Sequence, residues 1–217
     1  MYSVERLCIL ELSKAPVPLN DVSQGALVLF KKGRDAMPLP KEKLYTIEDI
    51  YALPDGERGE LIDGKLYMMA PPSRIHQKIL QELSRVIGNH ISGKGGSCEV
   101  YPAPFAVFLN EDDKNYVEPD ISVICDKNKL TDKGCSGAPD WIIEIVSPSS
   151  QRMDYLTKLL KYRTAGVKEY WIVNPMKETV QVYSFEGTED STQYSFSDLI
   201  GSKIFKDLII CITDMLK

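Results

Sequence analysis

The sequence predicts an α/β domain in which helices flank a mixed β-sheet. Segments with helical spacing of apolar residues alternate with short runs of β-branched and aromatic residues. Some of these runs are apolar throughout, which is typical of strands covered on both faces. The order along the chain is helix, hairpin, helix, strands, helix, strands, and a short loop between two late strands indicates antiparallel pairing. Together these observations favour one mixed sheet over an all-helical or all-β domain.

The predicted domain covers residues 44–217 and follows an N-terminal extension at residues 1–43. The extension holds two proline-containing stretches, "KAPVPLND" and "DAMPLPKEK", around a short candidate strand, "ALVLF". No apolar run approaches the roughly 20 residues of a membrane-spanning helix. The N-terminus lacks the basic start and cleavage site of a signal peptide. We therefore expect a cytoplasmic protein that does not enter a membrane.

The first half of the domain begins with a capping-box-like sequence at Thr46, which predicts a short helix ending near Leu53. "GELIDGKLYMMA" then places two apolar runs around Asp63-Gly64, a dipeptide typical of a tight hairpin turn. Ser73 can cap the long amphipathic helix that follows, which ends at the glycines of residues 93–96.

The second half contains the strand segments "CEVYPAPFAVFL", "YVEPDISVIC" and "WIIEIVS". A helix is predicted from about Gln151 to Ala165, with Gly166 as its stop signal. "KEYWIVNP" and "TVQVYSFEG" follow as two further strands. The pattern of the tail, "IFKDLIICITDML", leaves a final strand and a short helix both open.

The cysteines at positions 8, 98, 125, 135 and 211 form no CxxC pair, and this odd, dispersed set indicates reduced thiols. With only two histidines, the chain is not expected to be a zinc enzyme. No glycine-rich nucleotide motif occurs. The net charge of −5 argues against a passive coating of nucleic acid, but it leaves room for a local basic groove. Basic residues of the two longer predicted helices are candidates for it: Arg74, Lys78, Arg85, Lys94, Arg152, Lys158, Lys161 and Arg163.

Two carboxylates stand out at the predicted strands. Glu144 lies within the apolar run "WIIEIVS", where burying an unpaired carboxylate would cost several kcal/mol, so it needs a basic partner, a proton or a metal ion. Asp120 lies at the head of the preceding strand. If the two strands are neighbours in register, both carboxylates converge on one edge of the sheet. Such a pair suits a hard divalent cation, Mg²⁺ or Mn²⁺.

A third group of polar residues lies on the helix after Glu144. Asp154, Lys158 and Tyr162 are spaced four residues apart and form a strip along one helix face. Lys158 borders an apolar arc, so its ammonium can reach the sheet edge.

These residues resemble the PD-(D/E)XK nuclease superfamily, through Pro119-Asp120 and the strand that carries Glu144. Within it, the chain is similar to the bacterial family called "putative restriction endonuclease". The matching stretches are "YTIEDIYALPDGERGELIDGKLYMMAPPSRIHQ", "VEPDISVI", "WIIEIVSPSS" and "DYLTKLLKYRTAGVKEYWIVNP", over roughly residues 45–185. The resemblance implies a restriction-endonuclease-like fold and a metal-dependent endonuclease that acts on DNA, with Asp120 and Glu144 as metal ligands.

The resemblance also assigns further site residues and shows one departure. Val146 stands where superfamily members usually carry lysine, and Lys158 is the position to which that lysine has moved. Glu60, in the hairpin, is marked as an auxiliary acid, and His76 and Asp154 are auxiliary candidates. Each candidate also has a structural interpretation: a turn cap for Asp120, a buried ion pair for Glu144, a solvated helix lysine for Lys158, a hairpin acid for Glu60, a core histidine for His76, and an exposed pair with Lys158 for Asp154.

Three functions remain open at this level. In the leading interpretation Asp120 and Glu144 hold the metal ion while Lys158 and Glu60 assist cleavage of DNA. The alternatives are a non-catalytic nucleic-acid or protein-interaction module on the same fold, and a hydrolase of smaller phosphoesters. A homodimer is expected, because a double-strand cut needs two active sites and two-fold dimers are the commonest assembly.

Overall fold

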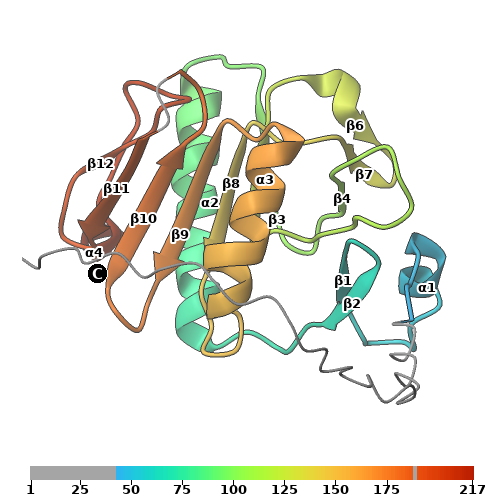
Figure 1. Ribbon diagram of the computed structural model, residues 1–217. Helices are drawn as coiled ribbons and strands as arrows, with labels where there is room; N and C mark the ends of the chain where they lie inside the picture. The colour runs from blue at the N-terminus through green and yellow to red at the C-terminus, as the bar shows by residue number, and fades with distance from the viewer. Residues whose placement is uncertain (1–42, 188–189) are drawn as a thin grey trace, which may run out of the picture. The chain divides into compact units, whose positions relative to one another are not determined.

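The computed structural model describes residues 43–187 and 190–217 (Figure 1). The described residues form a mixed α/β fold, as the sequence predicts. The predicted extension at residues 1–43 falls outside them except for its last residue, so that boundary stays a prediction. Among the described residues, no helix combines the length and apolar character needed to cross a membrane.

The elements follow in the predicted order. The helices are α1 (Ile47–Tyr51), α2 (Arg74–Gly93), the 3-10 turn η1 (Lys127–Lys129), the π-helix η2 (Met153–Lys158), α3 (Leu159–Ala165) and α4 (Ile212–Met215). The strands are β1 (Gly59–Ile62), β2 (Lys65–Met68), β3 (Glu99–Pro102), β4 (Val107–Phe108), β5 (Ile121–Ile124), β6 (Leu130–Thr131), β7 (Gly134–Ser136), β8 (Trp141–Ile145), β9 (Glu169–Asn174), β10 (Thr179–Ser184), β11 (Asp190–Ser195), β12 (Ile200–Gly201) and β13 (Ile209–Ile210).

A six-stranded mixed sheet in the order β11-β10-β9-β8-β5-β3 forms the centre of the fold. β8 and β9 run parallel, joined by the η2–α3 crossover, while the other neighbours are antiparallel. β5, β8 and β9 are buried along their whole length. Of the two candidate carboxylates, Glu144 lies on β8 and Asp120 directly precedes β5.

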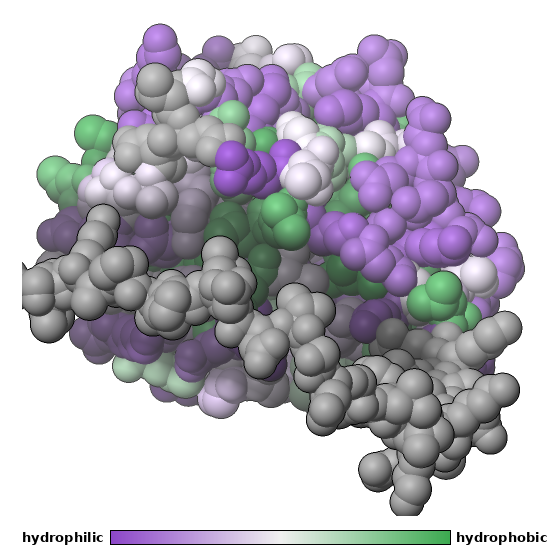
Figure 2. All heavy atoms as spheres, viewed as in Figure 1, coloured by the Kyte–Doolittle hydropathy of each residue, from purple (hydrophilic) through white to green (hydrophobic). Residues whose placement is uncertain are grey.

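Helices cover both faces of this sheet, with α2 on one side and η2–α3 on the other (Figure 1). Trp141 and Ile143 of β8 pack in the cluster of α2, whereas Ile142 packs in the cluster of α3. Because side chains alternate along a strand, Glu144 belongs to the α3 face. In the space-filling view of the α3 side, hydrophilic residues gather over β6 and β7, and apolar residues show mainly in the hollowed middle (Figure 2).

The β1–β2 hairpin turns at Asp63 and Gly64, which have φ values of 51° and 75°. Both lie in the left-handed region, as the predicted Asp-Gly turn requires. The backbone amides of Leu61 and Tyr116 each donate to the other's carbonyl, over 2.6 and 2.8 Å. This bridge attaches the hairpin to the segment before β5 and holds Glu60 of β1 near the main sheet.

The helix predicted over residues 151–165 is less regular than expected. Its middle, Met153–Lys158, is a π-helix, and a regular α-helix resumes at Leu159. It ends at Gly166, whose φ of 97° is left-handed, as the predicted stop signal implies. The apolar spacing of the sequence predicts the helix and its end but not this wide turn. Such turns recur at functional sites.

The prediction that all cysteines are reduced was wrong. Cys98 and Cys125 form a disulfide, although 27 positions separate them. They flank β3 and β5, whose register pairs Glu99 with Ile124, so the sheet brings the two thiols face to face. Cys135 and Cys211 are free. The ambiguous tail contains both a strand, β13, and a short helix, α4.

Candidate functional site

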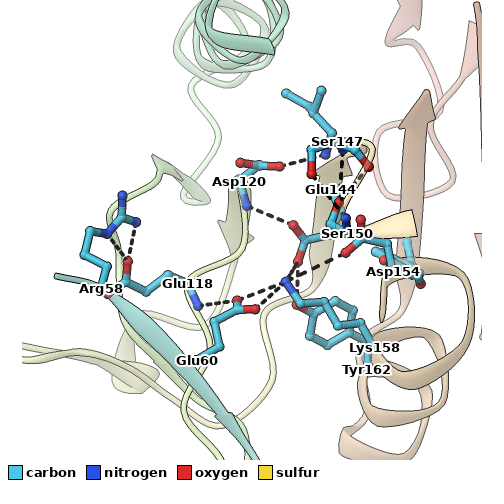
Figure 3. Close-up of polar contacts among 12 residues, drawn as sticks. Arg58, Glu60, Glu118, Asp120, Glu144, Ser147, Ser150, Asp154, Lys158 and Tyr162 are labelled. Atoms are coloured by element: carbon cyan, nitrogen blue, oxygen red, sulfur yellow. Dashed lines mark hydrogen bonds and ion pairs between the residues drawn. The ribbon is translucent and has the colours of Figure 1, made fainter. Parts of the chain in front are cut away.

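Asp120 and Glu144 lie side by side where β5 begins and β8 ends (Figure 3). β5 and β8 are antiparallel with Ile121 opposite Ile143, so the residue before β5 meets the end of β8. The Asp120 amide donates to Glu144 Oε2 over 3.5 Å, and the Ile145 amide donates to Asp120 Oδ2 over 2.7 Å. The expected convergence of the two carboxylates is therefore confirmed.

The Lys158 ammonium lies close to three carboxylates (Figure 3). Its Nζ is 2.8 Å from Glu60 Oε2, 2.9 Å from Glu144 Oε1 and 3.9 Å from Asp154 Oδ1. The Tyr162 hydroxyl donates to the same Glu144 Oε1 over 2.6 Å. The buried charge of Glu144 is thus compensated by a buried lysine and a phenol.

Two of the structural interpretations made from the sequence were wrong. Lys158 is 5% exposed and Asp154 is 2% exposed, so neither is a solvated residue and their contact is not an exposed ion pair. The helix strip faces inward because η2 packs on the sheet face to which Glu144 points. The buried ion pair considered for Glu144 is present, with Lys158 as the partner.

The geometry explains how Lys158 can stand in for the missing lysine of the motif. Val146 is 3% exposed and packs in the α3 cluster, on the same face as Glu144. A residue at this position would share that face because it lies two positions after Glu144. Lys158 contacts the Glu144 carboxylate from η2, which covers this face of the sheet. The ammonium therefore comes from the covering helix rather than from β8 itself.

Glu60 is held by more than Lys158. Its Oε1 accepts the backbone amide of Glu118 over 3.0 Å, and its side chain is 6% exposed. Glu118 in turn accepts the Tyr116 hydroxyl over 2.7 Å and pairs with Arg58. Sequence reasoning missed Glu118, Arg58 and the bond from Tyr162. Arg58 and Glu118 are 60 positions apart, and no local pattern links them.

His76 reaches the site from the start of α2. Ser73 caps this helix by accepting the His76 amide, and His76 Nε2 lies 3.2 Å from Asp120 Oδ2. The side chain is buried, and its Nδ1 finds no hydrogen-bond partner among the described residues. His76 is therefore placed beside Asp120 rather than in a purely apolar core.

The cluster holds more acid than base: Glu60, Glu144 and Asp154 contact Lys158, and Asp120 lies beside Glu144. Burial, together with the neighbouring acids, raises the pKa of Glu144 well above its usual range, although Lys158 opposes this. Burial likewise raises the pKa of Asp154 to about 6. Burial tends to lower the pKa of Lys158, but the Glu144, Glu60 and Asp154 carboxylates outweigh it and raise that pKa. The lysine therefore stays charged at neutral pH.

The protein side chains can supply only some of the ligands that a Mg²⁺ ion needs. Within the described part of the chain, no three His, Cys, Asp or Glu groups are arranged to hold a metal ion. Mg²⁺, however, is usually held by one or two carboxylates, with waters and substrate phosphate as further ligands. Asp120 and Glu144 provide such a pair, and the surplus negative charge of the cluster favours a cation beside them.

The site opens into a pocket of about 590 Å³. Glu60, Asp120, Glu144 and Lys158 line it, together with the apolar segment 68–72 and the serine-rich segment 145–150. This volume is in the range of pockets that bind small molecules or parts of larger ligands.

None of the basic residues proposed for a local groove, apart from Lys158, lines the pocket among the described residues. α2 and α3 cover opposite faces of the sheet (Figure 1), and several of the candidate basic residues are buried or paired with acids. Lys158 is buried, Lys94 pairs with Asp207, and Lys161 pairs with Asp63.

The mixed sheet and its two helical layers define a mixed α/β domain, with a carboxylate–lysine cluster where β5 begins and β8 ends. The fold matches the crystal structure of a protein described as a "putative nuclease belonging to DUF820" from Anabaena variabilis, with a TM-score of 0.63 at 23% identity. That match covers 78% of this chain and 96% of the other. Residues 47–210 match the Uma2 family, described as "Putative restriction endonuclease", and the chain belongs to this family.

Two relatives from Synechocystis show the same pattern of distant similarity. The "Uncharacterized protein slr1290" is 28% identical over 128 residues, which make up 58% of this chain and 66% of the relative. The "Uncharacterized protein sll1609" is 26% identical over 148 residues, or 67% of this chain and 80% of that protein. The chain thus spans just under two thirds of the first relative's length.

Proposed function

We propose that this protein is a metal-dependent endonuclease that hydrolyses phosphodiester bonds in DNA. The observation that carries the proposal is the contact of the Lys158 ammonium with Glu144, beside Asp120, in the wall of a pocket. It restores a carboxylate–carboxylate–lysine set although the motif strand lacks its lysine. Membership of a family described as "Putative restriction endonuclease" supports the same conclusion.

In this proposal Asp120 and Glu144 would hold Mg²⁺ or Mn²⁺. The bound ion would polarise a phosphoryl oxygen and lower the pKa of a bound water. Lys158 has a raised pKa, so it acts through its fixed positive charge rather than as a base. A fixed charge of this kind stabilises negative charge that develops in the transition state.

The remaining residues position the two carboxylates and the lysine. Glu60 also holds the ammonium, and Tyr162 fixes the Glu144 oxygen that the ammonium contacts. His76 and the Ile145 amide both lie against Asp120 Oδ2 and orient that carboxylate. Each of these contacts is made by a buried group, so the arrangement is preorganised before substrate arrives.

Nicking of supercoiled plasmid in Mg²⁺, in Mn²⁺ and without metal tests the proposal. We expect metal-dependent nicking that is lost in Glu144→Gln and Asp120→Asn. Glu169→Gln is the matched control, because Glu169 is another buried glutamate on the neighbouring strand β9. DNA binding without nicking by the unmodified protein would instead indicate the non-catalytic module. Hydrolysis of nucleotides but not of plasmid would instead indicate a hydrolase of smaller phosphoesters.

A further inference from the structure

Arg58 provides the accessible positive charge in the lining of the pocket. Among the described residues, the lysines and arginines that line it are Arg58 and Lys158. The Lys158 ammonium is enclosed by Glu60 and Glu144, and its side chain is 6% exposed. The Arg58 side chain is 40% exposed, so its guanidinium remains accessible from the pocket.

The Arg58 guanidinium is also held in a defined orientation. Its Nε donates to Glu118 Oε2 over 2.8 Å, and its Nη2 donates to the same oxygen. Glu118 is itself 9% exposed and accepts the Tyr116 hydroxyl through its other oxygen. A guanidinium has five N–H donors, and bonding through Nε and Nη2 to one oxygen does not exhaust them. Glu118 therefore orients the Arg58 guanidinium and leaves its other N–H groups free to bind a ligand.

The same glutamate connects Arg58 to the carboxylate cluster (Figure 3). The Glu118 amide donates to Glu60 Oε1 over 3.0 Å, and Glu60 contacts the Lys158 ammonium. The position of Arg58 is thus fixed relative to the groups that would act on the scissile bond.

We propose that Arg58 binds a phosphate of the nucleic-acid strand adjacent to the phosphate that is cleaved. This inference rests on the endonuclease function proposed above. A planar guanidinium matches phosphate oxygens with paired hydrogen bonds, which a buried, enclosed ammonium cannot supply. The start of α2 lines the same pocket and has no acid in its first turn, so the helix dipole adds to the attraction for phosphate.

The test is the salt dependence of DNA binding, measured by fluorescence anisotropy with a short labelled single-stranded oligonucleotide. Calcium replaces magnesium, and a gel confirms that the DNA stays uncut. We expect Arg58→Gln to weaken binding roughly tenfold or more, because it removes a hydrogen bond to a charged group. The slope of log K against log salt should become shallower by about 0.7, the value for one phosphate contact on a single strand.

Arg85 provides the matched control. Its Nε and Nη2 both donate to Glu82 Oε2, over 3.0 and 2.5 Å, which repeats the pairing of Arg58 with Glu118. It lies on α2 and is absent from the pocket wall. Arg85→Gln should leave affinity and salt slope unchanged. Arg58→Lys, which keeps the charge, should keep the slope while it weakens binding.

The outcomes separate the two proposals. A wild-type slope in Arg58→Gln overturns the phosphate site, even where the variant has lost nicking activity. A shallower slope in both Arg58→Lys and Arg58→Gln overturns it as well, because the loss would follow from structure rather than charge. Plasmid nicking by wild type together with an unchanged slope in Arg58→Gln leaves the endonuclease function standing. A wild-type protein that neither binds nor nicks DNA overturns both proposals.

Discussion

Two buried glutamates on neighbouring parallel strands have opposite surroundings. Glu169 of β9 is fully buried and accepts only neutral donors: the amides of Lys203 and Ile204, the Ser202 hydroxyl and the Trp171 indole, all within 3.0 Å. Glu144 of β8 faces a buried ammonium and a phenol and lies among other carboxylates. Burial is the largest cause that raises the pKa of each carboxyl.

The difference shows how to tell a structural carboxylate from a functional one. Neutral donors from residues 202–204 and from Trp171 of β9 satisfy Glu169, and the first group fixes residues 202–204 against the start of β9. Around Glu144 the charges of several elements are brought together beside a pocket, which costs stability unless a ligand uses them. Burial alone therefore does not mark the site, whereas a surplus of like charge at a cavity does.

The largest expected effect comes from removing the ammonium. Lys158→Ala leaves Glu60 and Glu144 buried without their cation, which typically costs about 3–5 kcal/mol of unfolding free energy. Such a loss would not follow from the replacement of a solvated helix lysine, which is how the sequence could also be interpreted. Urea unfolding measures the change. Lys161→Ala, at a position that pairs with exposed Asp63, should cost under about 1 kcal/mol. Equal, small losses in both variants would contradict the charged-cluster interpretation.

A smaller but decisive effect should separate the two glutamates in activity. Glu144→Gln removes one of the proposed ligand charges, and we expect nicking to fall by at least about a hundredfold, the size seen when one electrostatic group is lost from an active site. Glu169→Gln should retain the wild-type rate per folded molecule. Initial nicking rates, corrected for the folded fraction by circular dichroism, provide the measurement. Equal losses in both variants would remove the distinction.

Glu169→Gln, which should keep its activity, is expected to lose stability. The amide group replaces an acceptor oxygen with a donor that faces other donors, so unfolding free energy should fall by about 1–3 kcal/mol. Hydrogen exchange should show where the loss occurs, with the amides of Lys203 and Ile204 losing protection first. Protection that is unchanged at these two amides would show that Glu169 does not hold the loop.

The smallest expected effect is a dependence of stability on pH that arises in the cluster. The folded-state pKa of Asp154, raised by burial to about 6, exceeds its usual value of 3.8, so folding favours the protonated form. Its stabilising contribution is full below about pH 4 and is lost as pH rises through 6. In metal-free buffer, unfolding free energy should fall by about 1 kcal/mol between pH 5 and pH 7 from this group. Asp154→Asn should flatten the profile, and an unchanged profile would contradict the assignment.

Much of the fold follows from local patterns. The Asp63-Gly64 turn, the Ser73 cap and the stop at Gly166 depend on backbone preferences of a few adjacent residues, so they were predictable. The wide turn of η2 was not, because the apolar spacing at residues 153–158 fits a regular helix equally well.

Of the candidate site, the sequence by itself determined the chemical groups, since an acid inside an apolar strand and an acid at a strand head require compensation. Only the tertiary structure decided which partner compensates each of them. Lys158 is buried because η2 packs on the face of β8 that carries Glu144, and Cys98 meets Cys125 because β3 pairs with β5. Arg58 meets Glu118 because the β1 hairpin bridges to the segment before β5. These contacts join residues far apart in the chain, and their free energy depends on packing that no local window of sequence contains.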